Sequence, residues 1–310
     1  MSRIQMFVFV EGTIADAFVF GGVCAAATER VPVLYELCTA RELPGDTGGK
    51  SRLLTFFSYL RRRNALLARF QGKATAVVIY LDKDVDDVKR SLRRSEHLVY
   101  TQWYDVQNYI YREGNILKGA AAAASLDPKI LQAELADSKR WCRAAAEKWR
   151  EWVMLCVLCA KHRIHCRTNY GVSSQINNPF GAATDRAALK EWTTRARRAA
   201  GLSKRAFADV LSKSERYVAR RFQAGQHDRL FKGKWYGVIL EADIKRMAGT
   251  KGYNSNGLVA RLPDVVSATL DFRDSWAKEL GRPVEVVAKK LHKLQRKQIP
   301  RVRRVASAIH

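Results

Sequence analysis

The chain has 310 residues, of which 47% are hydrophobic and 27% charged, a composition typical of a globular protein and not of a disordered or membrane-spanning one. Lys and Arg total 55 against 30 Asp and Glu, which gives a formal net charge of +25 at pH 7. This charge favours a polyanionic partner. Since the longest apolar run near the N-terminus, residues 17–28, is well short of a bilayer span, no membrane partner is expected and nucleic acid is the first hypothesis.

Two features predict a cytoplasmic protein. The apolar run at residues 7–10 is interrupted by Glu11, so it does not have the pattern of a signal peptide. The six cysteines show no regular spacing of the kind that a disulfide framework requires, which favours a reducing compartment.

Residues 1–125 carry 17 basic and 13 acidic side chains and alternate between strand-like and helix-like patterns. Strands are expected at residues 4–10, 31–37 and 74–81, and an amphipathic helix at 50–70. Strand–helix–strand alternation predicts the α/β class, with a parallel or mixed sheet covered by helices. We expect this lobe to be the catalytic one.

Residues 126–310 carry 38 basic and 17 acidic side chains, and strand signals fade there. A basic, mostly α-helical lobe is therefore expected after residue 125. From Arg282 onwards there are nine basic residues and one acid, which predicts a basic C-terminal tail over 282–310. The expected helices cover residues 126–136, 138–163, 185–200, 203–222, 234–247, 262–280 and 284–297.

Two of the expected strands end in carboxylates: the first leads into Glu11 and Gly12, and the third into Asp82 and Asp84. Side chains two residues apart on a strand point to the same side, so the two aspartates are expected to converge. If the strands are neighbours, Glu11 faces this pair at the carboxyl edge of the sheet, where ligands of open α/β sheets bind. Three carboxylates there would suit Mg²⁺ or Mn²⁺, and Gly12 would let a phosphate approach the backbone.

A structural reading of the second acidic cluster is also open. Asp84 could be the N-cap of a short helix, with Asp86 and Asp87 stabilising its N-terminus through the helix dipole.

The order of several short blocks resembles a known family. Glu11-Gly12 after an N-terminal strand and Asp82-x-Asp84 ending a later one resemble the TOPRIM fold of topoisomerases, primases and OLD-type nucleases. Further blocks narrow the resemblance to the divergent, OLD-related TOPRIM-like family encoded beside ABC-type ATPases in anti-phage operons, whose members include the PARIS effector nuclease subunit. These further blocks are Asp16, the glycine-rich helix start at residues 48–51, the segment 104–109 and the segment Phe231–Trp235.

The resemblance implies a metal-dependent nuclease that an ABC-type ATPase sensor subunit holds inactive until infection, and that is a homodimer once released. It implies RNA, specifically tRNA, as the favoured target, with DNA as the alternative. Carried over by position, Glu11 is the general acid/base or a metal ligand, and Asp82 and Asp84 are metal ligands. Lys234, or Lys232, contacts the phosphate or stabilises the transition state.

The chain departs from the family pattern at two places. The family usually has Glu in the block where this chain has Gln107, and a neutral amide weakens a metal site. Asp105 could compensate if the backbone turns it inward. The spacing from Glu11 to Asp16 is also one residue longer than in the family, which leaves Asp16 as a candidate ligand or supporting residue.

A P-loop NTPase is a competing hypothesis. Residues 44–51 nearly spell a Walker A loop that ends in Lys50 and Ser51, and the strand ending at Asp82 could serve as Walker B. However, the motif needs Gly six residues before the lysine, where this chain has Pro44. A simpler reading is a glycine-rich turn whose helix N-terminus, with Lys50, holds an anion.

Two further motifs lie in the basic lobe. Cys156, Cys159, His162 and Cys166 have the residue types that zinc prefers, but they fall in an apolar helical run, which favours core packing. Residues 201–225 resemble a repressor-type helix-turn-helix, with Ser212 in the turn, and support a non-catalytic nucleic-acid-binding regulator as the alternative function. In either case Arg216 and Arg220 are candidate phosphate contacts.

Overall fold

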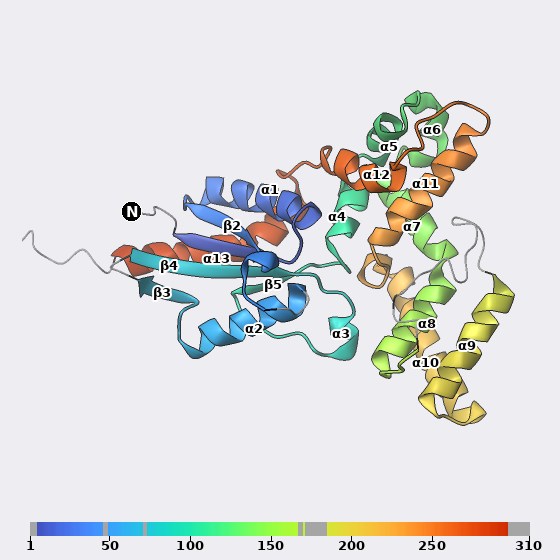
Figure 1. Ribbon diagram of the computed structural model, residues 1–310, viewed down its shortest axis with the longest axis horizontal. Coiled ribbons are helices and arrows are strands. Elements are labelled where there is room, and N and C mark those ends of the chain that lie inside the picture. Colours follow the sequence, from blue (N-terminus) through green and yellow to red (C-terminus); the bar gives the residue numbers. More distant parts are fainter. Residues whose placement is uncertain (1–4, 46–48, 71–72, 167–169, 171–184, 297–310) are drawn as a thin grey trace, which may run out of the picture. The chain divides into compact units, whose positions relative to one another are not determined.

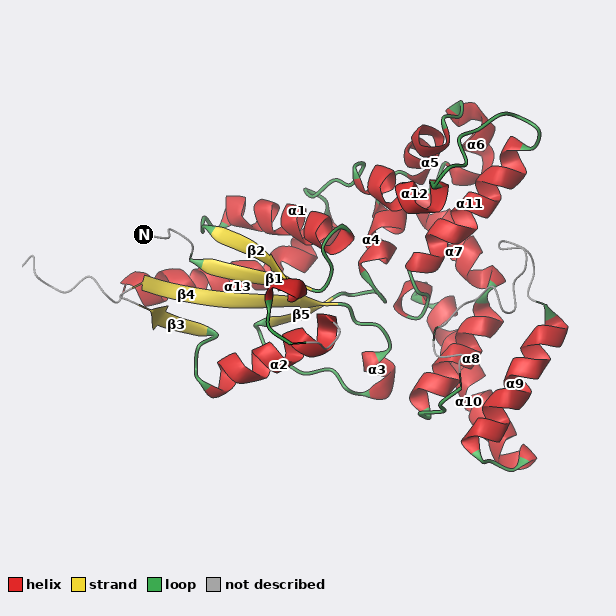
Figure 2. Ribbon diagram, viewed as in Figure 1, coloured by secondary structure: helices red, strands yellow, loops and turns green. Residues whose placement is uncertain are grey.

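The computed structural model describes residues 5–45, 49–70, 73–166, 170 and 185–296 (Figures 1 and 2). The chain divides into two compact units, which do not follow the expected boundary at residue 125. The sheet unit comprises residues 1–81, 93–100 and 272–310, and the helical unit comprises residues 82–92 and 101–271. The C-terminal part of the chain thus returns to the sheet, and residues 101–125 belong with the helices.

The sheet unit confirms the predicted α/β class. Its elements are β1 (Met6–Val10), α1 (Ala15–Arg30), β2 (Tyr35–Thr39), the 3₁₀ turn η1 (Ala40–Glu42), α2 (Gly49–Arg62), β3 (Leu67–Phe70), β4 (Lys73–Leu81), β5 (Leu98–Tyr100) and α13 (Ser275–Arg296).

The sheet is mixed, with the order β2-β1-β4-β3 and with β5 also paired to β4. β1 lies between β2 and β4 and is parallel to both, with Phe9 opposite Cys38 on one side and Ile79 on the other. β3 forms an antiparallel hairpin with the first half of β4, and β5 runs parallel to its last residues. The expected helix over 50–70 is therefore wrong after Arg62, where the chain turns back into β3.

Alternate residues of β4 serve two different cores. Ile79 packs in the core that includes Leu53 and Phe57 of α2. On the other face, the Tyr80 ring stacks on Phe20 of α1 at 4.3 Å, and its hydroxyl donates to the Leu280 carbonyl of α13 at 3.0 Å. In Figure 1, α1 and α13 accordingly lie on one side of the sheet and α2 on the other. Burial on both faces explains why β4 is an almost uninterrupted apolar run.

The expected basic tail over 282–310 is wrong for its first part. Residues 282–296 continue α13, which buries Val284, Val287 and Leu291 in the sheet unit. Glu285 forms a 2.7 Å ion pair with Arg30 of α1. Amphipathic burial therefore outweighs the basic composition here. The rest of the predicted tail, residues 297–310, lies outside the described residues.

The helical unit contains the remaining elements. They are α3 (Asp86–Lys89), α4 (Val106–Glu113), α5 (Ile116–Ala124), α6 (Pro128–Leu135), α7 (Ser138–Lys148), α8 (Arg150–Lys161), α9 (Arg186–Ala200), α10 (Lys204–Gln223), the 3₁₀ turn η3 (His227–Arg229), α11 (Lys234–Ala248) and α12 (Leu258–Ser267). Over the described ranges, no helix combines the length and the apolar character needed to cross a membrane.

Candidate metal and phosphate sites

β1 and β4 pair in parallel, which meets the condition under which the sequence analysis placed Glu11 and the two aspartates at one sheet edge. Since both strands run in the same direction, their carboxyl ends lie at the same edge of the sheet. Glu11 directly follows Val10, the last residue of β1. Asp82 directly follows Leu81, the last residue of β4, and is the first residue of the helical unit.

The loop after β1 is held by Asp16. This carboxylate is buried at the start of α1, and its Oδ2 accepts a hydrogen bond from the Gly12 N–H at 2.7 Å. A Cβ at position 12 would lie 3.1 Å from the Asp16 carboxylate, so the closeness of this contact already accounts for the glycine. Asp16 is thus placed to shape the loop that carries Glu11.

The N-terminus of α2 lies beside Glu11. A Cβ at Gly49 would be 3.2 Å from the Glu11 carbonyl oxygen, so a side chain at position 49 would crowd this contact. Lys50 is in the first turn of α2, with its Nζ 6.0 Å from the centre of the Tyr100 ring. A lysine and a helix N-terminus therefore accompany the carboxylate that follows β1.

The arrangement of this region does not fit a P-loop. In a P-loop, the glycine-rich segment joins a strand to a helix directly. Here the 3₁₀ turn Ala40–Glu42 intervenes between β2 and α2. Residues 46–48 of the expected motif lie outside the described residues.

The structure corrects the expected geometry of Asp82 and Asp84. Neither residue is in a strand: Asp84 has a left-handed backbone with φ 51°, and its N–H donates to the Tyr104 carbonyl at 2.7 Å. Asp82 accepts a hydrogen bond from the Val106 N–H at 3.1 Å. The structural alternative is confirmed in part: Asp86 and Asp87 lie in the first turn of the short helix α3, but its N-cap is Val85 and not Asp84.

Asp105, the residue named as a possible compensation for Gln107, is buried within the helical unit. It is the N-cap of α4, 2% exposed, and its side chain accepts from the Asn108 N–H at 3.3 Å. The pKa of this carboxyl is raised to about 7. Burial is the largest cause and the charge of Asp84 adds to it, while the positive charge of Lys234 opposes it. Its Oδ2 and the Oε1 of Gln107 are buried and have no hydrogen-bond partner among the described residues.

The segment Phe231–Trp235 packs on this end of α4. A Cβ at Gly233 would lie 2.2 Å from the Asp105 Oδ1 and 2.4 Å from the Asn108 nitrogen, so the contact requires glycine. Lys232 and Lys234 flank Gly233, and both lower the pKa of Asp105 electrostatically. The two lysines named from the sequence are therefore brought next to Asp105 within the helical unit.

A buried polar network that the sequence analysis missed supports this packing. The Asp228 carboxylate, 1% exposed, accepts hydrogen bonds from Arg112 at 2.6 Å, from Tyr236 at 2.6 Å and from Asn108 at 3.4 Å. The Asn108 side chain also donates to the Phe231 carbonyl at 3.1 Å. The network ties α4, η3 and α11 together. In the sequence, Asp228 lies between His227 and Arg229, and this triplet has no pattern that predicts a buried hydrogen-bond network.

The oxygen donors of this region suit a hard divalent cation. The described residues contain no group of three or more His, Cys, Asp or Glu side chains already gathered as a metal-binding set. In the helical unit, however, Asp105 Oδ2 and Gln107 Oε1 are buried oxygen atoms that lack a hydrogen-bond donor among the described residues. Mg²⁺ needs few protein ligands, because it keeps waters and phosphate oxygens in its shell.

Core packing explains the cysteine-rich stretch. Cys156 and Cys159 are buried in α8, at 0% and 1% exposed. Cys159 Sγ lies 3.4 Å from Cys166 Sγ, and His162 is at the C-cap of α8. Burial raises the pKa of the Cys156 thiol well above its usual value, as expected for a cysteine packed among apolar side chains.

The helix-turn-helix prediction is wrong. Residues 204–223 form one continuous helix, α10, capped by the Ser203 side chain. The expected turn at Ser212 falls inside it, where an ion pair between Lys213 and Asp209 at 2.7 Å joins successive turns. Arg216 and Arg220 nevertheless lie together on this helix.

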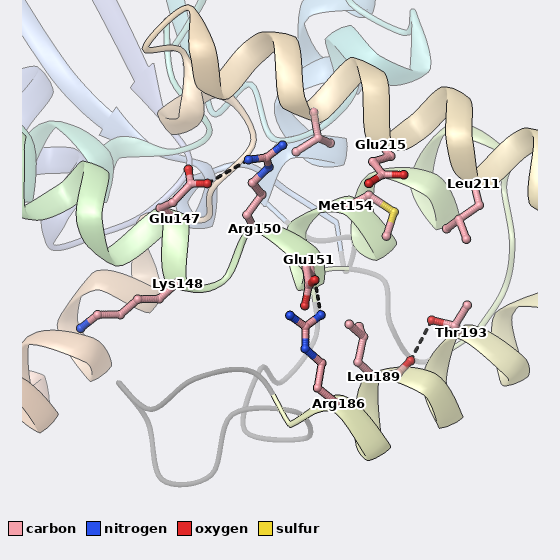
Figure 3. Close-up of a pocket in the computed structure, with 11 residues that line it drawn as sticks. Glu147, Lys148, Arg150, Glu151, Met154, Arg186, Leu189, Thr193, Leu211 and Glu215 are labelled. Carbon is pink, nitrogen blue, oxygen red and sulfur yellow. Dashed lines mark hydrogen bonds and ion pairs between the residues drawn. The ribbon is translucent and has the colours of Figure 1, made fainter.

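Two pockets adjoin α10 and differ in charge. One, of about 710 Å³, has three acidic and three basic side chains in its lining, among them the ion pairs Arg150–Glu147 and Arg186–Glu151 (Figure 3). The other, of about 600 Å³, has five cations and no carboxylate; its lining is Lys161, Lys213, Arg216, Tyr217, Arg220, Arg221 and Gln226. We call the second one the basic pocket.

Comparisons with protein-family models, with curated proteins and with solved structures found no match to this chain. The chemistry of the sites therefore rests on their own residues.

Proposed function

We propose that this protein is a Mg²⁺-dependent nuclease, active also with Mn²⁺, that cleaves nucleic acid, with RNA and in particular tRNA favoured over DNA. The resemblance in its sequence blocks further suggests a cytoplasmic effector of phage defence. In this proposal an ABC-type ATPase sensor subunit holds it inactive, and the released chain is a homodimer.

The parallel pairing of β1 and β4 carries the proposal. It makes Glu11 and Asp82 the residues that directly follow two adjacent strands at one sheet edge. Carboxyl ends of parallel strands are the usual ligand-binding edge of α/β sheets. The buried carboxylate of Asp105, within the electrostatic reach of Lys232 and Lys234, adds support, because it would provide a carboxylate in place of the one that Gln107 lacks.

Each residue has a proposed role. By the resemblance, Glu11, Asp82 and Asp84 are the proposed metal ligands; within the helical unit, Asp105 and Gln107 are candidate supporting oxygen donors. When bound, the ion lowers the pKa of a water and offsets charge on the phosphodiester. Lys234 contacts the phosphate as its charge develops, Lys232 and Lys50 provide further positive charge, and Asp16 fixes the Glu11 loop through Gly12.

A cleavage assay tests this function. The purified chain is incubated with total tRNA, with single-stranded RNA and with duplex DNA, in Mg²⁺ or in EDTA. We expect cleavage of RNA in Mg²⁺ alone, and a loss of at least about a hundredfold in Glu11→Gln, since the substitution removes a charged ligand or base and keeps its size.

The matched control is Glu36→Gln, an exposed glutamate on β2 of the same unit. It is expected to cleave like the wild type. Cleavage by Glu11→Gln at the wild-type rate, or equal cleavage in EDTA, would contradict the proposed site.

A further inference from the structure

The basic pocket concentrates five positive charges, of which one is paired with a carboxylate. Lys213 is ion-paired with Asp209 at 2.7 Å. For the other four cations, no carboxylate of the described residues lies within ion-pairing distance. Gathering five like charges in about 600 Å³ costs folding free energy, and a bound anion would offset that cost.

The pocket is organised around an aromatic ring. Lys161 Nζ lies 5.6 Å and the Arg221 guanidinium 5.4 Å from the centre of the Tyr217 ring. Arg221 also hydrogen-bonds to the Gln226 side chain. Cation–π contacts therefore hold a lysine and an arginine in place without neutralising them. Arg216 and Arg220, one helical turn apart and exposed, complete the positive wall.

Guanidinium groups in such a wall suit phosphate. Arginine presents its donors as a planar fork that can bind two phosphate oxygens at once. Three arginines and two lysines side by side match a row of phosphodiester groups better than a single small anion.

Backbone hydrogen bonds within the helical unit link the segment after the basic pocket to the acid-bearing loop. Gln226 at its rim leads into η3, where the Asp228 carbonyl accepts from the Tyr104 N–H at 2.8 Å. The Tyr104 carbonyl in turn accepts from the Asp84 N–H at 2.7 Å. These bonds fix the loop of Asp84 to the segment that directly follows the pocket residue Gln226.

We propose that the basic pocket binds the phosphodiester backbone of a nucleic-acid strand and leads that strand towards the loop of Asp82 and Asp84. The proposed nuclease function supplies the reason for holding the strand there; the binding itself does not depend on cleavage.

Fluorescence anisotropy in EDTA tests the binding separately from cleavage. The probes are fluorescein-labelled single-stranded RNA and DNA 20-mers of the same sequence, titrated with the full chain at several salt concentrations. The pocket variant is the double substitution Arg216→Gln and Arg220→Gln. The matched control is Lys129→Gln and Arg140→Gln, two exposed cations on α6 and α7.

We expect the pocket variant to bind at least about tenfold more weakly at 0.1 M salt, with the slope of log K against log salt reduced by about 1.4, because two phosphate contacts are lost. The control should keep the wild-type affinity within about twofold, since neither cation lines the pocket. Tighter binding of the RNA or of the DNA probe would show which of the two nucleic acids the protein prefers.

Equal weakening of the pocket variant and the control would overturn the proposal, because binding would then depend on net charge alone. Wild-type chain that binds neither probe would also overturn it. Binding through the pocket without cleavage in Mg²⁺ would leave this inference standing and reject the nuclease function, and the Glu11→Gln variant should bind like the wild type.

Discussion

At the scale of single residues, Asp105 is the most informative group in the molecule. It is 2% exposed and is the N-cap of α4, a position that normally favours an ionised carboxylate. Burial outweighs that preference and raises its pKa to about 7, although Lys234 opposes the shift. An acid with this pKa can exchange a proton near neutral pH, which is the range that general acid–base chemistry needs.

The pKa of Asp105 has a consequence for stability. Its folded value lies above the value of 3.8 expected without burial, so the native state binds more protons than the unfolded chain between about pH 4 and pH 7. Stability from this group is therefore lost as the pH rises through that window. Asp105→Asn, which keeps the cap but carries no charge, should raise the melting temperature by about 4 °C or more at pH 8 and change it little at pH 4.

Thermal unfolding in EDTA at the two pH values measures this difference. The control is Asp137→Asn at the exposed N-cap of α7, which should shift the melting temperature by less than about 1 °C at either pH. A lower melting temperature for Asp105→Asn at pH 8 would mean that Asp105 is ionised and stabilised by Lys234.

At the scale of elements, the candidate residues of the helical unit contact one another at the N-terminus of α4. Asp82 accepts from its first helical N–H, Asp105 caps it, and the Gly233 turn packs against it. The buried Asp228 carboxylate of η3 accepts hydrogen bonds from α4 and α11 and so holds these three elements together. The positions of Lys232 and Lys234 follow from this packing.

Gly233→Ala tests the junction. The added Cβ would be 2.2 Å from the Asp105 carboxylate and 2.4 Å from the Asn108 backbone nitrogen, so the turn must move. We expect the free energy of unfolding to fall by about 1–3 kcal/mol in urea denaturation. Gly252→Ala, where a Cβ meets nothing within 4 Å, should change it by less than about 0.5 kcal/mol. Equal effects of the two substitutions would show that the turn is not tightly packed.

The sequence predicts the elements that have a strong local pattern. β1 and β4 are long apolar runs ended by a carboxylate, and both lie within two residues of the expected ranges. β3 and β5 are four and three residues long, too short for a periodicity, and depend on pairing with β4. Local pattern therefore identifies the central strands and misses the short ones beside them.

The helix ends near the C-terminus depend on tertiary contacts. The expected helix over 262–280 is broken after Ser267, where the Thr269 hydroxyl accepts from the Asn115 N–H at 2.7 Å. Conversely, α13 continues through Pro283, which normally ends a helix, because its apolar face is buried on both sides of the proline. Contacts between distant residues decide both cases.

The same limit applies to the positions of the candidate ligands. Glu11 and Asp82 follow from the rule that ligands bind at strand ends. The left-handed turn at Asp84, the inward cap of Asp105 and the role of Gly233 depend on contacts with residues 20 to more than 100 positions away, such as Tyr104 and Phe231. Such contacts leave no periodicity in the sequence.

At the scale of the whole molecule, most of the positive charge and the proposed carboxylate ligands lie in different parts of the chain. The net charge of +25 comes mainly from residues after 125, and the basic pocket gathers five of those cations on α8 and α10. Electrostatic steering by this charge would raise encounter rates with a polyanion and make binding depend on salt. The acidic residues at the strand ends are few, and the proposed metal binding depends on them.

Direct measurement of metal binding tests that claim. Electron paramagnetic resonance of Mn²⁺ follows the loss of the free-ion signal as the protein binds the ion. We predict that the wild type binds Mn²⁺, and that Glu11→Gln with Asp82→Asn weakens binding at least about tenfold, because two charged oxygen ligands become neutral. Glu36→Gln with Asp127→Asn, at two exposed positions, should bind like the wild type. Equal Mn²⁺ binding by both double variants, or no binding by the wild type, would contradict the account.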